Sequence, residues 1–491
     1  MGARRPAQQG IESLRDAHPS TTRVLVVRSA AKLASKRWHR QRLHVVLTAM
    51  RRFAAELRAE GFEVDERDVA SLRAGLSEHR RRYRPERVVA MEPMSWSGLE
   101  MLAREGVRVV RSNQFLCHRD DFAGWAGDRD GRLRMEDFYR WQRRRLGYLM
   151  DGDEPAGGRW NFDADNRLPP PADDRDWPRP KAAALDEVDR QVLATLPGGA
   201  FGDTPTGLWP TSRRAALDRL AHVVDDVLPI FGPHEDAMLT DEWRLAHTML
   251  SSSLNIGLLH PGEVADAIED AYRAGRAPLA SAEGLMRQVI GWREYVWGVY
   301  WLWMPGYRDA NVLEARRPLP PVYTGSPTRM RCVASALGGV EARGWAHHIQ
   351  RLMVLGNLAL LSGVEPRAMV EWMWASFVDG AEWVMLPNVV GMSLHADGGR
   401  MATKPYAAGG AYIRRMSDHC RGCAYRPGER TGERACPFTT LYWDFMARHE
   451  ARFATNHRMA RPVRGLHRLG DLDAVRARAA EVLELLDAGE L

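Results

Sequence analysis

The sequence lacks the runs and signals that would send a chain into or across a membrane. It has no stretch of about 18 consecutive apolar residues, the minimum for a membrane-spanning helix. Its first residues, Met-Gly-Ala-Arg-Arg-Pro-Ala-Gln-Gln, have no apolar core, so they do not predict a signal peptide. Five cysteines in 491 residues are too few for a disulfide framework. These absences predict a cytoplasmic protein.

Two further features are scarce. No Gly-x-Gly-x-x-Gly follows any predicted strand, so the dinucleotide-binding fingerprint is absent. Lysine is also rare, and arginine supplies most of the 69 basic residues that outweigh 63 acidic ones to give a net charge of +6. Because guanidinium forks suit phosphates, the charge favours nucleic acid or a phosphorylated cofactor. A solvated surface with a small excess of arginine explains the charge equally well.

The N-terminal part alternates between strand and helix patterns. Predicted strands cover residues 23–28, a segment starting at 62, 87–91 and 107–110, and predicted helices cover 40–60, 68–82 and 95–105. Such alternation predicts a parallel sheet with helices on both faces.

The pattern changes near residue 135. Residues 135–150 are predicted to form a helix, 151–182 are rich in Pro, Gly and Asp without periodicity, and 185–491 are nearly all helical. A chain of this length needs more than one core. We therefore predict an α/β domain over 1–134, a helix and linker over 135–184, and an α-helical domain over 185–491.

The cysteines form a ligand pattern. Cys420-x-x-Cys423 and Cys436-Pro437 lie within 17 residues, and Cys332 is the candidate for a fourth ligand. Four thiolates predict zinc or an iron–sulfur cluster. Zinc sites more often pair two Cys-x-x-Cys knuckles, so one knuckle with two scattered cysteines favours [4Fe–4S]; buried free thiols are the third reading. Cys117 is predicted to be a core thiol.

Tryptophan is abundant. The chain has 17, ten of them from Trp243 to Trp443. Because a buried indole N–H needs a partner, so many indoles are compatible with stacking on a flat heterocycle or with electron hopping. A large core that uses Trp is an equally good explanation from composition.

Several motifs together carry a resemblance. They are Gly158-Arg-Trp-Asn-Phe-Asp163, Gly232-Pro-His-Glu-Asp-Ala-Met238, Leu254-Asn-Ile-Gly-Leu258, Gly291-Trp-Arg-Glu-Tyr295, His347-His-Ile-Gln-Arg-Leu-Met353, Pro387-Asn-Val, Thr403-Lys-Pro-Tyr406 and Arg415-Met-Ser-Asp418, with cysteine spacings of 88, 3 and 13. Over residues 23–460 the chain resembles the iron–sulfur bacterial cryptochromes and photolyases, the group that contains the prokaryotic (6-4) photolyases. The resemblance implies an N-terminal photolyase-like α/β domain and a helical domain that binds FAD and the [4Fe–4S] cluster.

The resemblance also implies where FAD binds. In this family the cofactor's phosphates rest on helix ends and basic side chains, so the missing glycine fingerprint is no objection. Thr248, Ser251 and Arg293 are the expected phosphate contacts, Arg351 and Asp379 the ion pair beside the isoalloxazine, and Asn388 the group near flavin N5. Taken singly, each residue could equally be a helix cap, a surface arginine or part of a structural ion pair.

The implied activity is light-dependent repair of (6-4) photoproducts in UV-damaged DNA by a lyase. The lesion leaves the duplex, Trp292 stacks on it, and Gln288 bonds a base edge. Excited, reduced FAD supplies an electron, and His348, with His347 beside it, supplies the proton. The expected electron-relay residues are Trp372, Trp374, Trp383 and Tyr406. Outside the family, a His-His pair that bonds backbone carbonyls would be the simpler reading.

The chain departs from the family at its antenna site. Relatives open with a strand ending in Gly-Asp-Gln-Leu, which is shortened or missing here, and residues 92–96 read Glu92-Pro-Met-Ser-Trp96 where the family tends to have Glu-Pro-Ser-Glu-Trp. We therefore expect weak or no binding of the antenna 6,7-dimethyl-8-ribityllumazine. A cryptochrome-type photoreceptor and a zinc-stabilised nucleic-acid-binding module are the alternative functions, and a monomer is expected.

Overall fold

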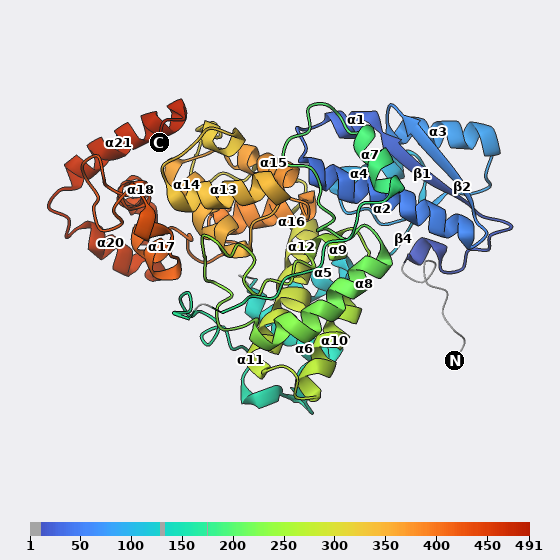
Figure 1. The fold of residues 1–491 in the computed structure, drawn as a ribbon, viewed down its shortest axis with the longest axis horizontal. Helices are drawn as coiled ribbons and strands as arrows, with labels where there is room; N and C mark the ends of the chain where they lie inside the picture. The colour runs from blue at the N-terminus through green and yellow to red at the C-terminus, as the bar shows by residue number, and fades with distance from the viewer. Residues whose placement is uncertain (1–10, 128–132, 174) are drawn as a thin grey trace.

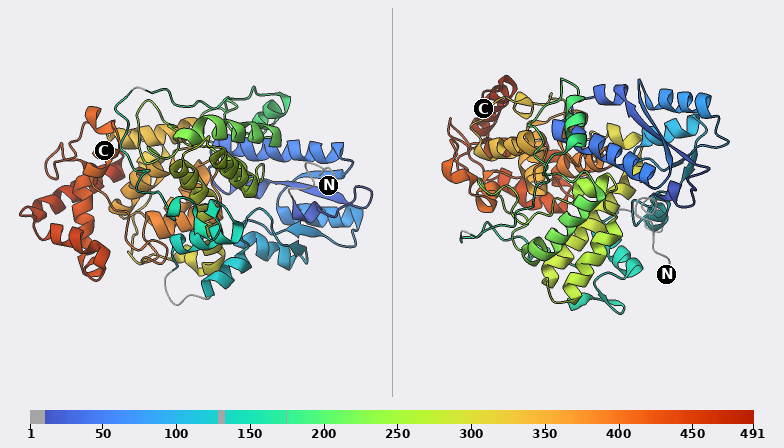
Figure 2. Two further views of the ribbon diagram at one scale, coloured as in Figure 1. Left: turned by 90° about the horizontal axis from the view of Figure 1, so that it is seen from below. Right: turned by 45° about the vertical axis from the view of Figure 1, so that its right-hand side comes forward.

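The computed structural model describes residues 11–127, 133–173 and 175–491. The α/β part lies at one end of the long axis and the last helices, α17 (Gly410–Met416) to α21 (Leu472–Ala488), at the other (Figure 1). The middle of the molecule is helical in all three views (Figures 1 and 2). None of the helices formed by the described residues has the length and apolar character that crossing a membrane requires.

The α/β part contains four of the predicted strands. Its elements are η2 (Glu12–Leu14), β1 (Arg23–Ser29), α1 (Ala30–Ala34), α2 (Arg40–Ala59), β2 (Glu63–Val69), α3 (Leu72–Tyr83), β3 (Val89–Met91), α4 (Trp96–Arg104) and β4 (Arg108–Val110). β1 pairs in parallel with β2, with Arg23 opposite Glu63, and β3 pairs in parallel with β4, with Val89 opposite Arg108. The parallel pairing agrees with the sequence prediction.

The predicted parallel strands are present, and among the described residues hydrogen bonding joins them as two separate pairs, β1–β2 and β3–β4. No described strand bonds to the other edges of β1 and β3. The short 3-10 helix η2 lies against β3 instead, and its Leu14 packs with Leu57 and Phe62 in a small apolar cluster.

Two helix boundaries also differ from the sequence prediction. The helix expected at 68–82 starts at Leu72, because Asp68 and Val69 continue β2 and the Ser71 hydroxyl accepts the Ala74 N–H at the helix start. The helix expected at 135–150 ends at Leu146, because Gly147 adopts the left-handed conformation (φ +80°), which glycine tolerates.

The helical part begins before residue 135. Its helices and strands are α5 (Arg119–Gly127), α6 (Met135–Leu146), β5 (Met150–Asp151), β6 (Glu154–Pro155), η3 (Ala156–Gly158), α7 (Glu187–Ala194), α8 (Arg213–His222), η4 (Val223–Val227), η5 (Leu228–Ile230), α9 (Ser251–Asn255), α10 (Pro261–Arg273), α11 (Leu279–Met286), η6 (Arg287–Trp292), α12 (Arg293–Trp303), η7 (Gly306–Asp309), η8 (Pro321–Thr324), α13 (Arg331–Arg343), η9 (Gln350–Gly356), α14 (Asn357–Ser362), α15 (Pro366–Ser376), α16 (Glu382–Pro387), η10 (Asn388–Ser393), α17, η11 (His419–Gly422), α18 (Pro437–Arg448), α19 (Glu450–Ala454), η12 (His457–Met459), α20 (Ala460–Leu466) and α21.

The core of this part is built around α12, which packs against α5, η6 and α16. Gly298 is required there, because a Cβ at this position would lie 2.1 Å from the Phe122 ring of α5. Phe122 thus belongs to the helical core although it precedes the predicted domain boundary at 134. The boundaries at 134 and 184 stay predictions.

Within the part of the chain that the structure describes, four helical segments are π-helical: η4, η6, η9 and η10. Such segments are rare and often occur at functional sites. Three of them carry residues singled out from the sequence, namely Gln288 and Trp292 on η6, Arg351 on η9 and Asn388 on η10. The local backbone is therefore irregular at the positions where the resemblance places function.

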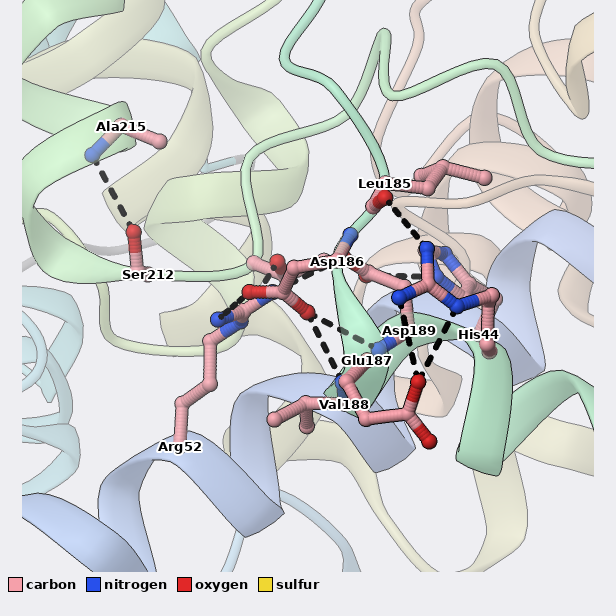
Figure 3. Close-up of polar contacts among 11 residues, drawn as sticks. His44, Arg52, Leu185, Asp186, Glu187, Val188, Asp189, Ser212 and Ala215 are labelled. Carbon is pink, nitrogen blue, oxygen red and sulfur yellow. Dashed lines mark hydrogen bonds and ion pairs between the residues drawn. The ribbon is translucent and has the colours of Figure 1, made fainter.

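An ionic network whose His44 and Asp189 are buried joins the two parts through α2 and α7 (Figure 3). Asp189 accepts hydrogen bonds from His44 Nε2 and from Arg52, both at 2.9 Å. Arg52 also bonds Asp186 at 2.8 Å, and Asp186 caps α7 by accepting the N–H of Val188. The hydrogen bond from Arg52 lowers the pKa of Asp186 far below its usual range. The network fixes the long connection onto the α/β part.

We expect Asp189→Asn to lower the free energy of unfolding by about 3 kcal/mol, because it leaves the Arg52 charge short of a buried partner. Asp189 is 3% exposed. The measurement is the urea midpoint of the unfolding transition. The matched control is Asp218→Asn, which removes an exposed ion pair with Arg214 and should cost at most about 1 kcal/mol. Equal losses in both variants would contradict a structural role for the network.

Candidate functional site: the flavin pocket, the histidine cluster and the cysteine centre

Three of the predicted FAD residues lie together. Arg351 donates a hydrogen bond to Asp379 Oδ1 at 2.9 Å, and the Ser251 hydroxyl donates to Asp379 Oδ2 at 2.7 Å. Asn255 holds the Asp379 backbone carbonyl at 2.8 Å. The cluster therefore brings together the start of α9, the π-helix η9 and the loop before α16. It presents a guanidinium, a carboxylate and a hydroxyl in a mostly buried setting.

The other predicted FAD residues lie outside this hydrogen-bonded cluster. Arg293 pairs with Glu294 at 2.8 Å and lies over the Phe115 ring. The Asn388 amide donates to the Val384 carbonyl at 2.8 Å, one turn back along its own helix. Thr248 is half-buried shortly before α9.

Sequence reasoning missed Arg42. This arginine of α2 bonds the backbone carbonyls of Phe377 and Val378, each at 3.4 Å, just before Asp379. Burial lowers the pKa of Arg42 to about 10, against the opposing pull of Asp379. The α/β part therefore supplies a buried cation next to the Arg351–Asp379 pair. The basic character of the helix predicted at 40–60 was the available signal.

A histidine cluster lies beside this site. His347 is 2% exposed, and its ring stacks on His247 with centroids 4.5 Å apart. His348 has a half-exposed side chain, and its Nε2 donates to Asp236 at 3.2 Å. His247 and Asp236 were not predicted as site residues. Asp236 stands in the Gly232–Met238 motif, which was the signal for it.

The environment gives these histidines different protonation states. Burial lowers the pKa values of His247 and His347 well below the usual range, and the neighbouring cationic groups lower them further. For His348, burial acts in the same direction, but the hydrogen bond and charge of Asp236 outweigh it and raise the pKa. His348 is thus the member of the cluster whose surroundings favour the protonated form.

Glu235 is a second titrating group close to His348. Burial raises its pKa to about 7, while the charge of His348 opposes this shift. Its Oε2 has no hydrogen-bond partner among the described residues. A Cβ on Gly284 of α11 would lie 3.3 Å from that oxygen. The end of α11, from which η6 continues with Gln288 and Trp292, therefore faces the histidine cluster.

The predicted lesion contacts are accessible. Gln288 and Trp292 are both partly exposed on η6, and Trp292 makes an edge contact with Tyr295 at 6.2 Å between centroids. Arg287, between them and α11, forms an ion pair with Asp163 at 3.0 Å.

The predicted relay residues fall into separate groups. Trp372 is buried, donates to the Tyr323 carbonyl at 2.8 Å and meets the Phe377 ring at 5.8 Å. The guanidinium of Arg351 lies 4.0 Å from the centre of the same Phe377 ring. Trp374 points elsewhere, packing on Trp38 at 6.1 Å. Among the predicted relay residues, Trp372 therefore contacts the Phe377 ring over which Arg351 of the Arg351–Asp379 pair lies.

Trp383 starts a row of indoles that the sequence did not reveal. Its ring lies 5.7 Å from Trp297, which lies 5.4 Å from Trp301, which lies 6.0 Å from Trp96 of α4. The row runs from the helical core to the α/β part. Tyr406 is half-buried, and burial raises its pKa.

The four predicted ligand cysteines line one cavity. Cys332 lies in the first turn of α13, Cys420 and Cys423 in and after η11, and Cys436 directly before α18. Burial, reinforced by the other three thiols, raises the pKa of Cys332 far above its usual range, and burial raises that of Cys420 to about 11. Cys117 is buried elsewhere, bonded through its backbone to Glu294.

Comparison with known proteins agrees with this fold and site. The chain is 43% identical over 468 residues, 91% of its length and 92% of the relative's, to a (6-4) photolyase of Agrobacterium fabrum strain C58. Residues 8–205 match the family of deoxyribodipyrimidine photo-lyase-related proteins. A crystal structure of a bacterial class III photolyase from Agrobacterium tumefaciens superposes with a TM-score of 0.58 at 16% identity, covering 98% of this chain and 95% of that one. The last likeness shows the shared fold.

The α/β part joined to a large helical part thus defines a photolyase-type protein, which confirms the predicted fold class and resemblance. The chain belongs to the family of deoxyribodipyrimidine photo-lyase-related proteins. Membership in this family implies a flavin cofactor and action on damaged DNA.

Proposed function

We propose that this chain is a (6-4) DNA photolyase that repairs pyrimidine–pyrimidone (6-4) photoproducts under light. The observation that carries the proposal is His348, half-exposed and held by Asp236 with a raised pKa, next to two neutral histidines. The 43% identical relative is named a (6-4) photolyase. A sensor would have no need of a protonated group at a lesion pocket.

The residues around Asp379 fit FAD. Ser251, Arg351 and Asp379 offer donors and an acceptor to a cofactor with hydroxyl, phosphate and amide groups. The hydroxyls of Ser252 and Ser253 are buried without a partner among the described residues, which costs free energy unless something bonds them. Thr248, Arg293 and Asn388 are proposed as further contacts. Bound and reduced, FAD would supply the light-driven electron.

The chain's own residues then position the base and move the proton. Trp292 stacks on the extruded base and Gln288 bonds its edge. His348 delivers a proton to the group that moves between the two bases, and Asp236 holds the imidazole in place. His347, neutral and buried, orients its neighbour. Trp372, Trp374, Trp383 and Tyr406 are the proposed electron-relay residues, with Trp372 best placed.

We propose a [4Fe–4S] cluster at Cys332, Cys420, Cys423 and Cys436. Two observations support it: the four thiols line one cavity, and one Cys-x-x-Cys knuckle with two scattered cysteines is less typical of zinc than two paired knuckles. Thiolate ligands suit such clusters. Weak or absent binding of a lumazine antenna, a monomeric state and a cytoplasmic location also stay predictions.

An illumination assay tests the proposed function. Oligonucleotides carrying either a (6-4) product or a cyclobutane dimer are irradiated with the purified, flavin-loaded protein. We expect light-dependent loss of the (6-4) product and none in the dark. Repair of the cyclobutane dimer instead would overturn the lesion assignment, and repair of neither would favour a photoreceptor.

A further inference from the structure

The histidine cluster has the geometry of a metal site distinct from the cysteine centre. His247, His347 and His348 each offer one ring nitrogen, and these three atoms all lie within 4.8 Å of one another. The rings of His247 and His347 are stacked, with 16° between their planes. His348 closes the group, with its ring centre 5.5 Å from that of His247.

The buried members have nitrogen atoms with nothing to bond. Both ring nitrogens of His347 and Nε2 of His247 are inaccessible and have no hydrogen-bond partner among the described residues. Leaving such groups unpaired costs about 1–3 kcal/mol each. A metal ion would give these unpaired imidazole nitrogens a partner, because histidine binds metals through a ring nitrogen.

We propose that His247, His347 and His348 bind a divalent transition-metal ion, with Zn²⁺ as the best-suited ion. Three imidazole nitrogens and an open fourth position match zinc coordination, whereas Mg²⁺ and Ca²⁺ prefer oxygen ligands. Asp236 completes the arrangement: its hydrogen bond fixes the His348 ring, as carboxylates do behind metal-bound histidines. The three ring nitrogens lie within 4.8 Å of one another, so small rotations of the rings would bring them to bonding distance of one ion.

Zinc binding at the histidine cluster would also affect repair, and this consequence rests on the proposed function. Zinc bound to His348 would occupy a ring nitrogen of the proposed proton donor, and it would therefore inhibit repair. Binding itself does not depend on the repair assignment.

Binding is measured on the flavin-loaded protein with its cysteine centre intact. Zinc is titrated by calorimetry, and Co²⁺ replaces it as a spectroscopic probe, since thiolate ligation would add a charge-transfer band that imidazole ligation lacks. We expect one equivalent without that band. His247→Gln should weaken binding at least about 10-fold, and Asp236→Asn about 10-fold. The control His467→Gln removes an exposed histidine paired with Glu450 and should bind zinc unchanged.

Three results would overturn the inference. They are no zinc uptake by the wild-type chain, a thiolate band with Co²⁺, and unchanged affinity in a His247→Gln variant whose flavin content and unfolding temperature are normal. In the repair assay, zinc should slow the wild-type chain and the His467→Gln variant equally, with recovery on chelation. If zinc binds as described but does not slow repair, the inhibition of the proton donor by zinc is refuted. Absence of repair with intact zinc binding would refute the proposed function alone.

Discussion

Replacing His348 by alanine will reduce the rate of (6-4) repair by about 100-fold or more while leaving flavin content and lesion binding close to normal. A positioned general acid contributes about 10² to 10⁴ in rate, and His348 is the histidine of its cluster whose pKa is raised. The measurement is single-turnover repair under saturating light. His467→Ala, which removes an exposed imidazole far along the chain, is the matched control.

The pH dependence gives a second readout of the same residue. Because Asp236 raises the pKa of His348 above 6.5, the protonated form persists to higher pH, and the repair rate should fall as pH rises through that raised pKa. Asp236→Asn removes the charge that raises it, so the fall should move to lower pH. If His348→Ala repairs at the full rate, or if Asp236→Asn leaves the profile in place, another group supplies the proton. Glu235, with its pKa near 7, would be next to test.

The second large effect concerns the cysteine centre. Cys332→Ser should abolish iron binding and unfold the C-terminal helices well below the unfolding temperature of the wild-type chain. Cys332 is buried at the start of α13, and the four cysteines that line one cavity come from α13, from η11 and the residue that follows it, and from the residue before α18. A cluster bound by these thiolates would therefore link the three segments. Metal binding of this kind is worth about 10 kcal/mol or more of folding free energy in small zinc domains.

Iron content and thermal unfolding by circular dichroism measure this effect. Cys117→Ser is the matched control, because Cys117 is equally buried but lies outside the centre. It should retain about four iron atoms per chain, the content of one [4Fe–4S] cluster. Full iron content in Cys332→Ser would remove Cys332 from the ligand set. Zinc in place of iron in the wild-type chain would contradict the cluster assignment.

The Arg351–Asp379 pair shows what the resemblance could predict about the proposed flavin site. The motif around residues 347–353 and the residues near 379 predicted Arg351 and Asp379 as a pair, and the structure places them in contact at 2.9 Å. Their roles toward FAD stay predictions. The sequence did not predict Arg42 as a site residue, because it lies more than 300 positions earlier in the chain. No local pattern indicates which face of α2 contacts residues 377–378.

By itself, the sequence determined the local structure and the chemical repertoire. The strand pattern at residues 23–28 and the helix pattern at 40–60 appear as β1 and α2, because backbone hydrogen bonding and apolar periodicity act over a few residues. The spaced cysteines likewise predicted a metal centre. Only the tertiary structure decided that the strands pair two by two, that His247 and Asp236 flank His348, and that an indole row runs from Trp383 to Trp96. These contacts join residues far apart in the chain, where packing and the satisfaction of buried polar groups decide the neighbours.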